Sequence, residues 1–125
     1  AIEFNGHKYY VYGNKMSWSD AKTYCEKQGG YLATITSQEE DSVLYDYITG
    51  QGYSSVYFGV TDEETEGIWK WVTGENLDYQ NWKKGEPNNE GKKEHYGMYY
   101  SKNADGTWND GNGKSGYFIC EWNVS

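Results

Sequence analysis

The residue pattern changes near position 50, and this change constrains the fold more than any other feature of the sequence. Two segments with helical spacing occupy residues 1–50, whereas the rest of the chain contains only short runs of β-branched and aromatic residues. Helices followed by a series of strands predict an α+β domain. The length of 125 residues fits one domain, 1–125, with no room for a second core of normal size.

Both helical segments begin with a capping signal. Ser17 precedes the first one, and the helical spacing places Cys25 on its buried face. Ser37 and Glu40 form a capping box at the start of the second, which continues as an amphipathic stripe to Gly50.

Strands are expected at both ends of the chain and throughout its second half. An Asn5-Gly6 turn predicts an N-terminal hairpin. Further strand-like runs cover residues 31–35, 56–60, 68–72, 96–100, 107–108 and 117–122, with a turn expected at 110–113. The Gly-, Asn- and Glu-rich stretch between Thr73 and Tyr96 predicts a long loop, and we place the functional loop region that it begins at about residues 73–110. Loops of this length in a compact domain are usually functional or disordered.

Aromatic residues supply most of the apolar surface. The chain has 23 Trp, Tyr and Phe residues but only 14 Leu, Ile and Val. So few aliphatic residues in a charged chain are typical of disorder. Each Trp or Tyr can bury roughly 150–250 Å², however, so we expect an aromatic core rich in hydrogen bonds.

The charge excludes several classes of partner. The chain carries 19 acidic residues against 11 lysines, a net charge of −8, which argues against nucleic acid and anionic membrane surfaces. No run approaches the roughly 20 apolar residues of a membrane span, and no signal-peptide pattern is present. The acidic excess leaves two interpretations open: a solubilising surface or a cation site.

The two cysteines, Cys25 and Cys120, lie 95 positions apart and are not a CxxC metal or redox pair. A bond between them would close nearly the whole domain and stabilise it by about 4–5 kcal/mol in the loop-entropy model. Two buried free thiols are the alternative.

Five oxygen-bearing side chains stand out in and after the long loop. They are Glu86, Asn88, Glu94, Asn109 and Asp110. Three carboxylates and two amides without His or Cys suit Ca²⁺, which takes six to eight oxygen ligands, whereas zinc prefers nitrogen or sulfur. A cis bond at Pro87, the sole proline, would direct its two flanking side chains to the same side of the chain.

Together these motifs resemble the C-type lectin carbohydrate-recognition domain. The matching segments are Trp18-Ser19-Asp20-Ala21 with Cys25, Tyr57-Phe58-Gly59-Val60, Thr61 to Gly67, Asn81-Trp82, Lys84 to Asn88, Glu94, Trp108-Asn109-Asp110 and Phe118 to Glu121. The resemblance implies two helices, antiparallel strands, a long calcium-binding loop and paired terminal strands. It also implies a Cys25–Cys120 disulfide and an extracellular, secreted or cell-surface location.

The resemblance further implies a calcium-dependent sugar site, because the five oxygen-bearing residues match the family's principal calcium position one for one. Two adjacent sugar hydroxyls would bind the ion, donate protons to carboxylates and accept hydrogen bonds from amides. The Glu86-Pro87-Asn88 order marks mannose-type sugars (mannose, GlcNAc, fucose or glucose) in this family. Glu90, just beyond that motif, is a candidate sugar contact.

A second calcium position is also implied, with departures from the family pattern. Its candidate ligands are Asp62, Glu66, Asn89 and Glu94. Asn89 and His95 stand where the family more often has Asp, and the loss of these charges should weaken calcium binding at this position. We expect His95 to be a surface loop residue. Tyr96 and Gly113 occupy the positions of the family's inner disulfide.

The candidate residues are compatible with three kinds of function. The leading one is a sugar-binding module whose partners are glycans or glycoproteins, with oligomers or tandem domains supplying avidity. The alternative is a related domain that binds a protein or another surface, with calcium only structural. A hydrolase using Glu86 and Glu94 as paired carboxylates is disfavoured, because both are better explained as ligands, so no enzyme activity is expected.

Overall fold

The computed structural model describes residues 1–87 and 93–124, and it begins with the predicted hairpin. Strand β1 (Ile2–Phe4) pairs antiparallel with β2 (His7–Met16). Asn5 and Gly6 at the turn have positive φ angles of 55° and 85°, as a tight Asn-Gly turn requires.

Both predicted helices form, and both start at the predicted caps. Helix α1 (Trp18–Lys27) begins after Ser17, whose Oγ accepts a hydrogen bond from the Asp20 amide at 3.1 Å. Helix α2 (Gln38–Gly50) begins after Ser37, whose Oγ accepts from the Glu40 amide at 3.1 Å. These bonds satisfy amide groups that have no partner within the helix.

The remaining strands follow the predicted order with different lengths. They are β3 (Tyr31–Leu32), β4 (Val56–Thr61), β5 (Lys70–Trp71), β6 (Tyr96–Tyr99), β7 (Trp108–Gly111) and β8 (Gly116–Asn123). The expected strands at 31–35 and 68–72 shrink to two residues each. The expected turn at 110–113 starts too early, since β7 continues through Gly111 in register with Tyr96 of β6.

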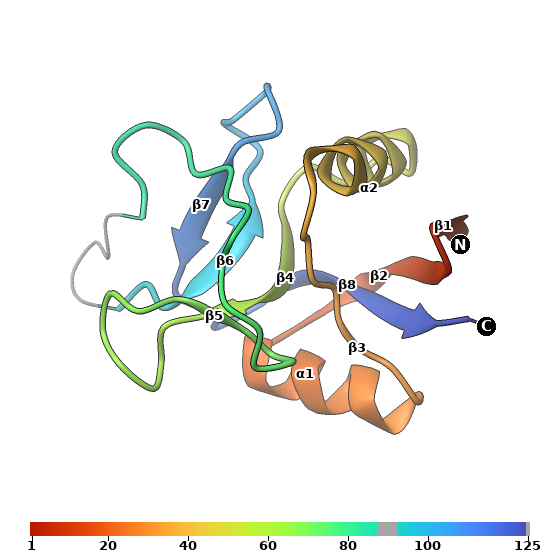
Figure 1. Ribbon diagram of the computed structural model, residues 1–125, viewed down its shortest axis with the longest axis horizontal. Coiled ribbons are helices and arrows are strands. Elements are labelled where there is room, and N and C mark those ends of the chain that lie inside the picture. Colours follow the sequence, from red (N-terminus) through yellow and green to blue (C-terminus); the bar gives the residue numbers. More distant parts are fainter. Residues whose placement is uncertain (88–92, 125) are drawn as a thin grey trace.

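The strands form one sheet in the order β1-β2-β8-β4-β6-β7, with β3 attached to β8 and β5 to β4. Pairing is antiparallel except between β4 and β8, which run parallel. Helices α1 and α2 lie on opposite sides of the sheet (Figure 1). The two termini lie together at one end, whereas β6, β7 and the long loop lie at the other end (Figure 1).

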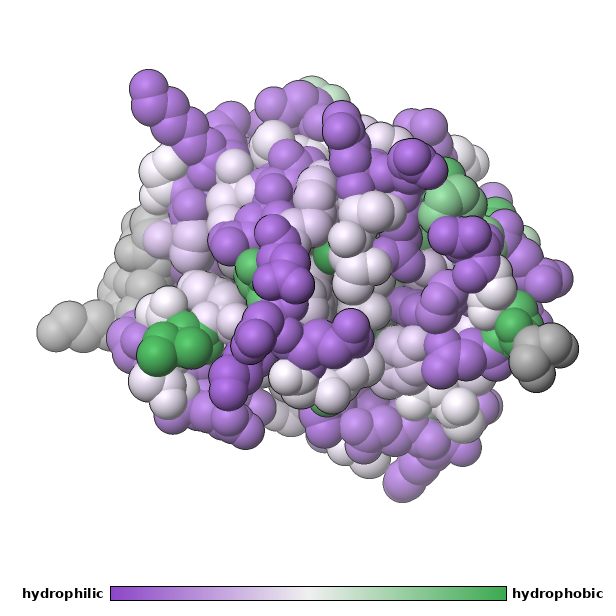
Figure 2. All heavy atoms as spheres, viewed as in Figure 1, coloured by the Kyte–Doolittle hydropathy of each residue, from purple (hydrophilic) through white to green (hydrophobic). Residues whose placement is uncertain are grey.

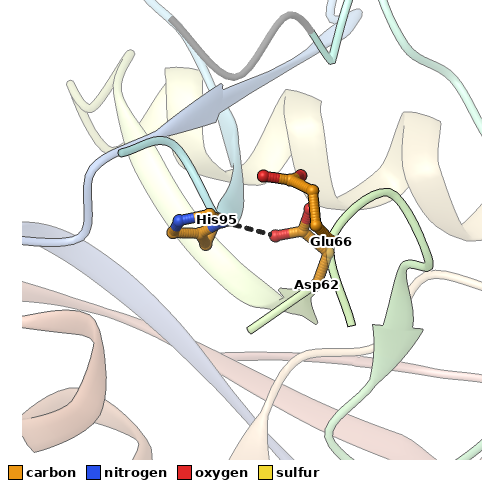
Figure 3. A group of neighbouring side chains, drawn as sticks. All are labelled: Asp62, Glu66 and His95. Atoms are coloured by element: carbon orange, nitrogen blue, oxygen red, sulfur yellow. Dashed lines mark hydrogen bonds and ion pairs between the residues drawn. The ribbon is translucent and has the colours of Figure 1, made fainter. Parts of the chain in front are cut away.

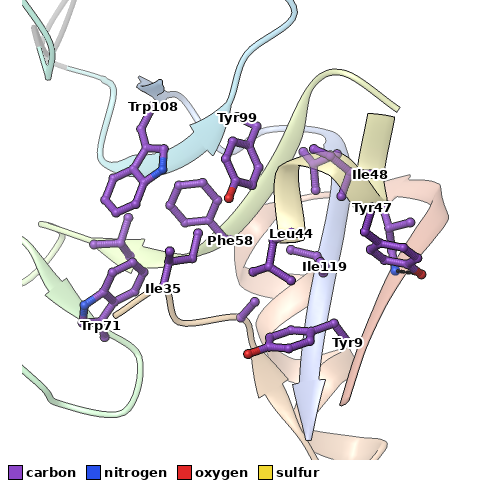
Figure 4. Close-up of a cluster of buried hydrophobic side chains, with 14 residues drawn as sticks. Tyr9, Ile35, Leu44, Tyr47, Ile48, Phe58, Trp71, Tyr99, Trp108 and Ile119 are labelled. Carbon is purple, nitrogen blue, oxygen red and sulfur yellow. Dashed lines mark hydrogen bonds between the residues drawn. The ribbon is translucent and has the colours of Figure 1, made fainter. Parts of the chain in front are cut away.

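Two hydrophobic clusters fill the spaces between sheet and helices, and alternation along β8 separates them. Ile119 belongs to the cluster under α2, whereas Phe118 and Cys120 belong to the cluster under α1. Six of the 14 buried residues on the α2 side are aromatic, in line with the aromatic core expected from the composition (Figure 4). Cys25 of α1 and Cys120 of β8 form a disulfide with their Cα atoms 5.6 Å apart, which confirms the pairing.

The outer surface is predominantly polar. The face in Figure 2 is mostly hydrophilic, with apolar residues in small separate groups. Within the described ranges, the large apolar side chains that are exposed are Tyr10, Ile68 and Val124. No helix in that part of the chain is long and apolar enough to cross a membrane.

A buried carboxylate ties α2 to the second half of the chain. Asp41 is 3% exposed. Its carboxylate oxygens accept hydrogen bonds from the side chains of Tyr79 (2.8 Å), Asn81 (2.8 Å), Tyr99 (2.5 Å) and Trp108 (3.3 Å). Burial and the nearby charge of Asp41 raise the pKa of Tyr99 well above its usual range, so this hydroxyl stays protonated and donates.

We predict that Asp41→Asn lowers the free energy of unfolding by about 3 kcal/mol or more. The amide removes a charge that accepts four hydrogen bonds and turns an NH₂ toward groups that are themselves donors. Urea unfolding would measure the change. Asp46→Asn, at an exposed site on the same helix, should change stability by less than about 0.5 kcal/mol; equal losses in the two variants would contradict the prediction.

Candidate functional site

A hollow of about 620 Å³ opens beside β6 and β7 at the end of the sheet away from the termini. Four of the five predicted oxygen ligands line it: Glu86, Glu94, Asn109 and Asp110. The fifth, Asn88, lies outside the described residues, as do Asn89 and Glu90. Glu86 and Pro87 are joined by a cis bond, the arrangement considered from the sequence.

Backbone hydrogen bonds bring the long loop alongside β7 and thereby set Glu86 near Asn109. The Trp108 amide donates to the Asn81 carbonyl at 2.8 Å, and the Lys83 amide donates to the Trp108 carbonyl at 2.9 Å. A turn closed by the Glu86 amide and the Lys83 carbonyl, 2.8 Å apart, then leads into the pocket. Segments separated by more than 20 residues of sequence therefore meet at one rim.

Trp108 anchors the strand that carries two of the candidate ligands. Its ring is fully buried and makes edge-on contacts with Phe58, Trp71, Tyr79 and Trp82 at centroid distances of 5.1 to 5.8 Å. Such aromatic pairs contribute about 0.5–1.5 kcal/mol each beyond the area that they bury. The next two residues of β7, Asn109 and Asp110, thus start from a fixed backbone.

Two further residues support the pocket and were not found from the sequence. Asn103 is 3% exposed, and its Nδ2 donates to the Thr107 carbonyl at 3.1 Å and to Asn109 Oδ1 at 3.3 Å. The Tyr57 hydroxyl, at the pocket wall, accepts from the Gly113 amide at 3.0 Å. Burial raises the pKa of Tyr57, which keeps this hydroxyl neutral. Tyr57 lies in one of the segments that match the family, but its hydroxyl acts through Gly113, 56 residues away, and no motif marks Asn103, whose partners lie four and six residues away.

The pocket has a mixed charge with an acidic excess. Three carboxylates face two amino groups there, those of Lys83 and Lys102. Asp110 is 1% exposed, whereas Glu86 and Glu94 are half-buried, so one carboxylate is held at the base of the pocket and two stand nearer its rim.

A second cluster contains Asp62, Glu66 and His95, whose potential ligand atoms all lie within 4.8 Å of one another (Figure 3). Asp62 and Glu66 were predicted for a second calcium position together with Glu94, which lines the larger pocket, and Asn89. His95 lies in a loop, as expected, with its side chain 30% exposed, and in addition its Nδ1 lies 2.9 Å from Asp62 Oδ1.

Tyr96 and Gly113, at the positions of the family's inner disulfide, contact each other directly. A β-carbon added at Gly113 would lie only 2.4 Å from the Tyr96 ring. That ring also stacks on Trp18 at 4.5 Å, and its hydroxyl donates to Glu63 at 2.9 Å. Burial and this bond raise the pKa of Tyr96 to about 12. Aromatic packing therefore fills the place of the missing covalent link.

We predict that Gly113→Ala is more destabilising than Gly74→Ala. Both glycines have positive φ angles, 69° and 89°, so both substitutions incur a backbone cost of about 1–2 kcal/mol. Nothing lies within 4 Å of a β-carbon at Gly74, whereas at Gly113 the Tyr96 ring must move, adding about 1–3 kcal/mol. Thermal unfolding of the two variants measures the difference, and equal losses would argue against the contact.

Comparison with known proteins settles the family. A family model described as the lectin C-type domain matches residues 14–122. The chain belongs to the C-type lectin domain family. It is 41% identical over 88 residues to C-type lectin domain family 4 member F of Rattus norvegicus, covering 67% of this chain and 16% of that protein. The chain thus spans about a sixth of this relative's length.

Solved structures of C-type lectin domains share the fold. The mouse scavenger receptor C-type lectin carbohydrate-recognition domain has a TM-score of 0.88 and 34% identity, with 99% of this chain and 94% of that chain covered. A calcium-independent type II antifreeze protein has a TM-score of 0.89 and 25% identity, with 99% and 92% covered. The fold therefore occurs both in a carbohydrate-recognition domain and in a protein that does not depend on calcium, so function has to be argued from the site residues.

Proposed function

We propose that this C-type lectin domain binds glycans in a calcium-dependent manner through the pocket beside β6 and β7. The observation that carries the proposal is the convergence of Glu86, Glu94, Asn109 and Asp110 on one hollow. Their side chains come from the long loop, the entry to β6 and strand β7. Backbone hydrogen bonds align the long loop that carries Glu86 with the strand that carries Asn109 and Asp110. Such an alignment is not needed for an acidic surface that only keeps a protein in solution.

The donor set fits calcium. All four residues offer carboxylate or amide oxygens, the ligand type that Ca²⁺ takes in sets of six to eight, and none offers the sulfur or nitrogen that zinc prefers. Calcium, when bound, would coordinate two neighbouring hydroxyl oxygens of a sugar. Asn88, outside the described residues, completes the proposed set.

The remaining hydrogen bonds to the sugar are proposed for the same residues. The carboxylates of Glu86 and Glu94 would accept the hydroxyl protons, and the NH₂ group of Asn109 would donate to the hydroxyl oxygens. The order Glu86-Pro87-Asn88 favours mannose-type sugars, since exchanging the acid and the amide would reverse the pattern of donors and acceptors. Such a small open site binds one sugar weakly, so several copies would be needed for avidity.

The disulfide supports a location outside the reducing cytosol. A Cys25–Cys120 bond persists in oxidising compartments. We therefore propose that the domain works in a secreted or cell-surface protein, where its partners would be glycans or glycoproteins.

We predict retention of the protein on immobilised mannose in the presence of Ca²⁺ and its elution by EDTA. Glu94→Gln and Asp110→Asn should abolish retention, because each removes a charge from the proposed calcium site. Asp78→Asn, an exposed carboxylate on the same long loop, should leave retention unchanged. Calcium binding without retention on any sugar column would favour the alternative, a domain that binds another surface with calcium only structural.

We also predict that Asn103→Ala weakens calcium binding by about tenfold or more, because Asn103 orients the Asn109 amide. Calorimetric titration with Ca²⁺, well below the melting temperature of the variant, would measure the dissociation constant. Asn76→Ala, an exposed amide on the long loop, serves as the control. A calcium affinity equal to that of the wild type would show that Asn103 only supports the fold.

A further inference from the structure

The cluster of Asp62, Glu66 and His95 differs in chemistry from the pocket beside it. Asp62 follows β4, Glu66 lies in the next loop, and His95 immediately precedes β6. Their side chains point toward one another in Figure 3, and their ligand atoms lie within 4.8 Å of one another. The cluster therefore combines two carboxylates with an imidazole nitrogen, a donor that the oxygen-lined pocket lacks.

We propose that Asp62, Glu66 and His95 form a binding site for a divalent transition metal such as Zn²⁺. Calcium and magnesium take oxygen ligands, whereas zinc and its neighbours in the first transition row bind imidazole nitrogen together with carboxylates. Zinc binds both imidazole nitrogen and carboxylate oxygen, and its open sites have three protein ligands with water in the remaining position, so one His and two carboxylates supply the required number. His95 thus changes the metal preference of a place where an Asp would favour calcium.

The distances require only a small adjustment. His95 Nδ1 and Asp62 Oδ1 are 2.9 Å apart and share a hydrogen bond. Two ligands of a tetrahedral zinc ion, each at about 2.0–2.2 Å, lie about 3.4 Å apart, so the ion can replace the shared proton after the pair opens by about 0.5 Å. Glu66 is exposed and has a carboxylate oxygen within 4.8 Å of the other two ligand atoms, so only a modest shift of its side chain would be needed to reach the same ion.

The surrounding backbone holds the two inner ligands in place. The Asp62 side chain is 1% exposed, and its second oxygen accepts from the Gly67 amide at 2.9 Å. The His95 carbonyl accepts from Thr61 Oγ1 at 2.7 Å and from the Asp62 amide at 3.1 Å. Hydrogen bonds that orient metal ligands in this way strengthen metal binding. Glu66 and the outer side of the imidazole face solvent, which gives an ion a path to enter.

The cluster lies where the family resemblance implied the second calcium position, but it is separate from the pocket that is proposed to bind sugar. The cluster uses none of Glu86, Glu94, Asn109 and Asp110, so metal binding here can be measured whether or not the pocket binds sugar.

The experiment is calorimetric titration of the 125-residue domain with Zn²⁺ in a buffer containing excess Ca²⁺, which keeps the oxygen-only pocket from competing. We expect one equivalent of Zn²⁺ to bind. His95→Asp should weaken Zn²⁺ binding by at least about tenfold. Loss of a residue that merely supports a metal ligand already lowers metal affinity by about that much, and loss of the ligand itself should lower it no less. The same substitution, titrated with Ca²⁺, should strengthen calcium binding at this position.

The second histidine provides a matched control. His7 also lies close to a carboxylate, 2.7 Å from Glu121, but is not part of a metal-binding group among the described residues. His7→Gln should therefore leave Zn²⁺ affinity unchanged. Imidazole resonances give a second readout: Zn²⁺ should shift the signals of His95 and not those of His7. Absence of Zn²⁺ binding, or equal affinity in the wild type and His95→Asp, would overturn the proposal.

Discussion

The arrangement of the pocket depends on the buried carboxylate of Asp41. A charge that is 3% exposed is costly to bury unless donors surround it, and here four side chains do so. The donors come from the long loop, β6 and β7, which are the segments that also carry or flank the proposed ligands. Asp41 therefore acts as a common attachment point: the loop can lack regular structure and still be fixed relative to β7, because Tyr79, Asn81 and Trp108 all bond to the same group.

The sequence predicted the features that depend on neighbouring residues. The caps at Ser17 and Ser37 and the Asn5-Gly6 turn are local devices, and all three are present. The candidate ligands could be named because the family resemblance spans most of the chain, and four of the five line one pocket. Strand lengths were less accurate: Ala33 bonds to Ile119 of β8 and to Gly59 of β4, but the next amide, that of Thr34, donates to the Glu121 side chain, so the strand that begins at Tyr31 ends at Leu32.

What the sequence could not show are contacts between residues far apart. Asp41 looks like any acid in the first turn of a helix, where negative charge is favourable. Asn103 and Asn109 are only six residues apart, but nothing in the sequence between them indicates that their side chains form a hydrogen bond. The contact between His95 and Asp62, which are 33 residues apart, is likewise not marked by any pattern in the sequence. Glu94 and His95 are adjacent in sequence but contribute to two different groups, one with oxygen donors only and one with nitrogen as well.

The position of the termini has a practical consequence. Ile2 to Phe4 forms one edge of the sheet and β7 the other, and Val124 bonds back to Gly6 beside the first hairpin. Both chain ends therefore leave the domain on the side opposite the pocket (Figure 1). A tag, a surface linkage or a neighbouring domain attached at either end would leave the hollow beside β6 and β7 facing outward. The domain can accordingly be immobilised or strung into arrays through its ends without blocking access to the pocket.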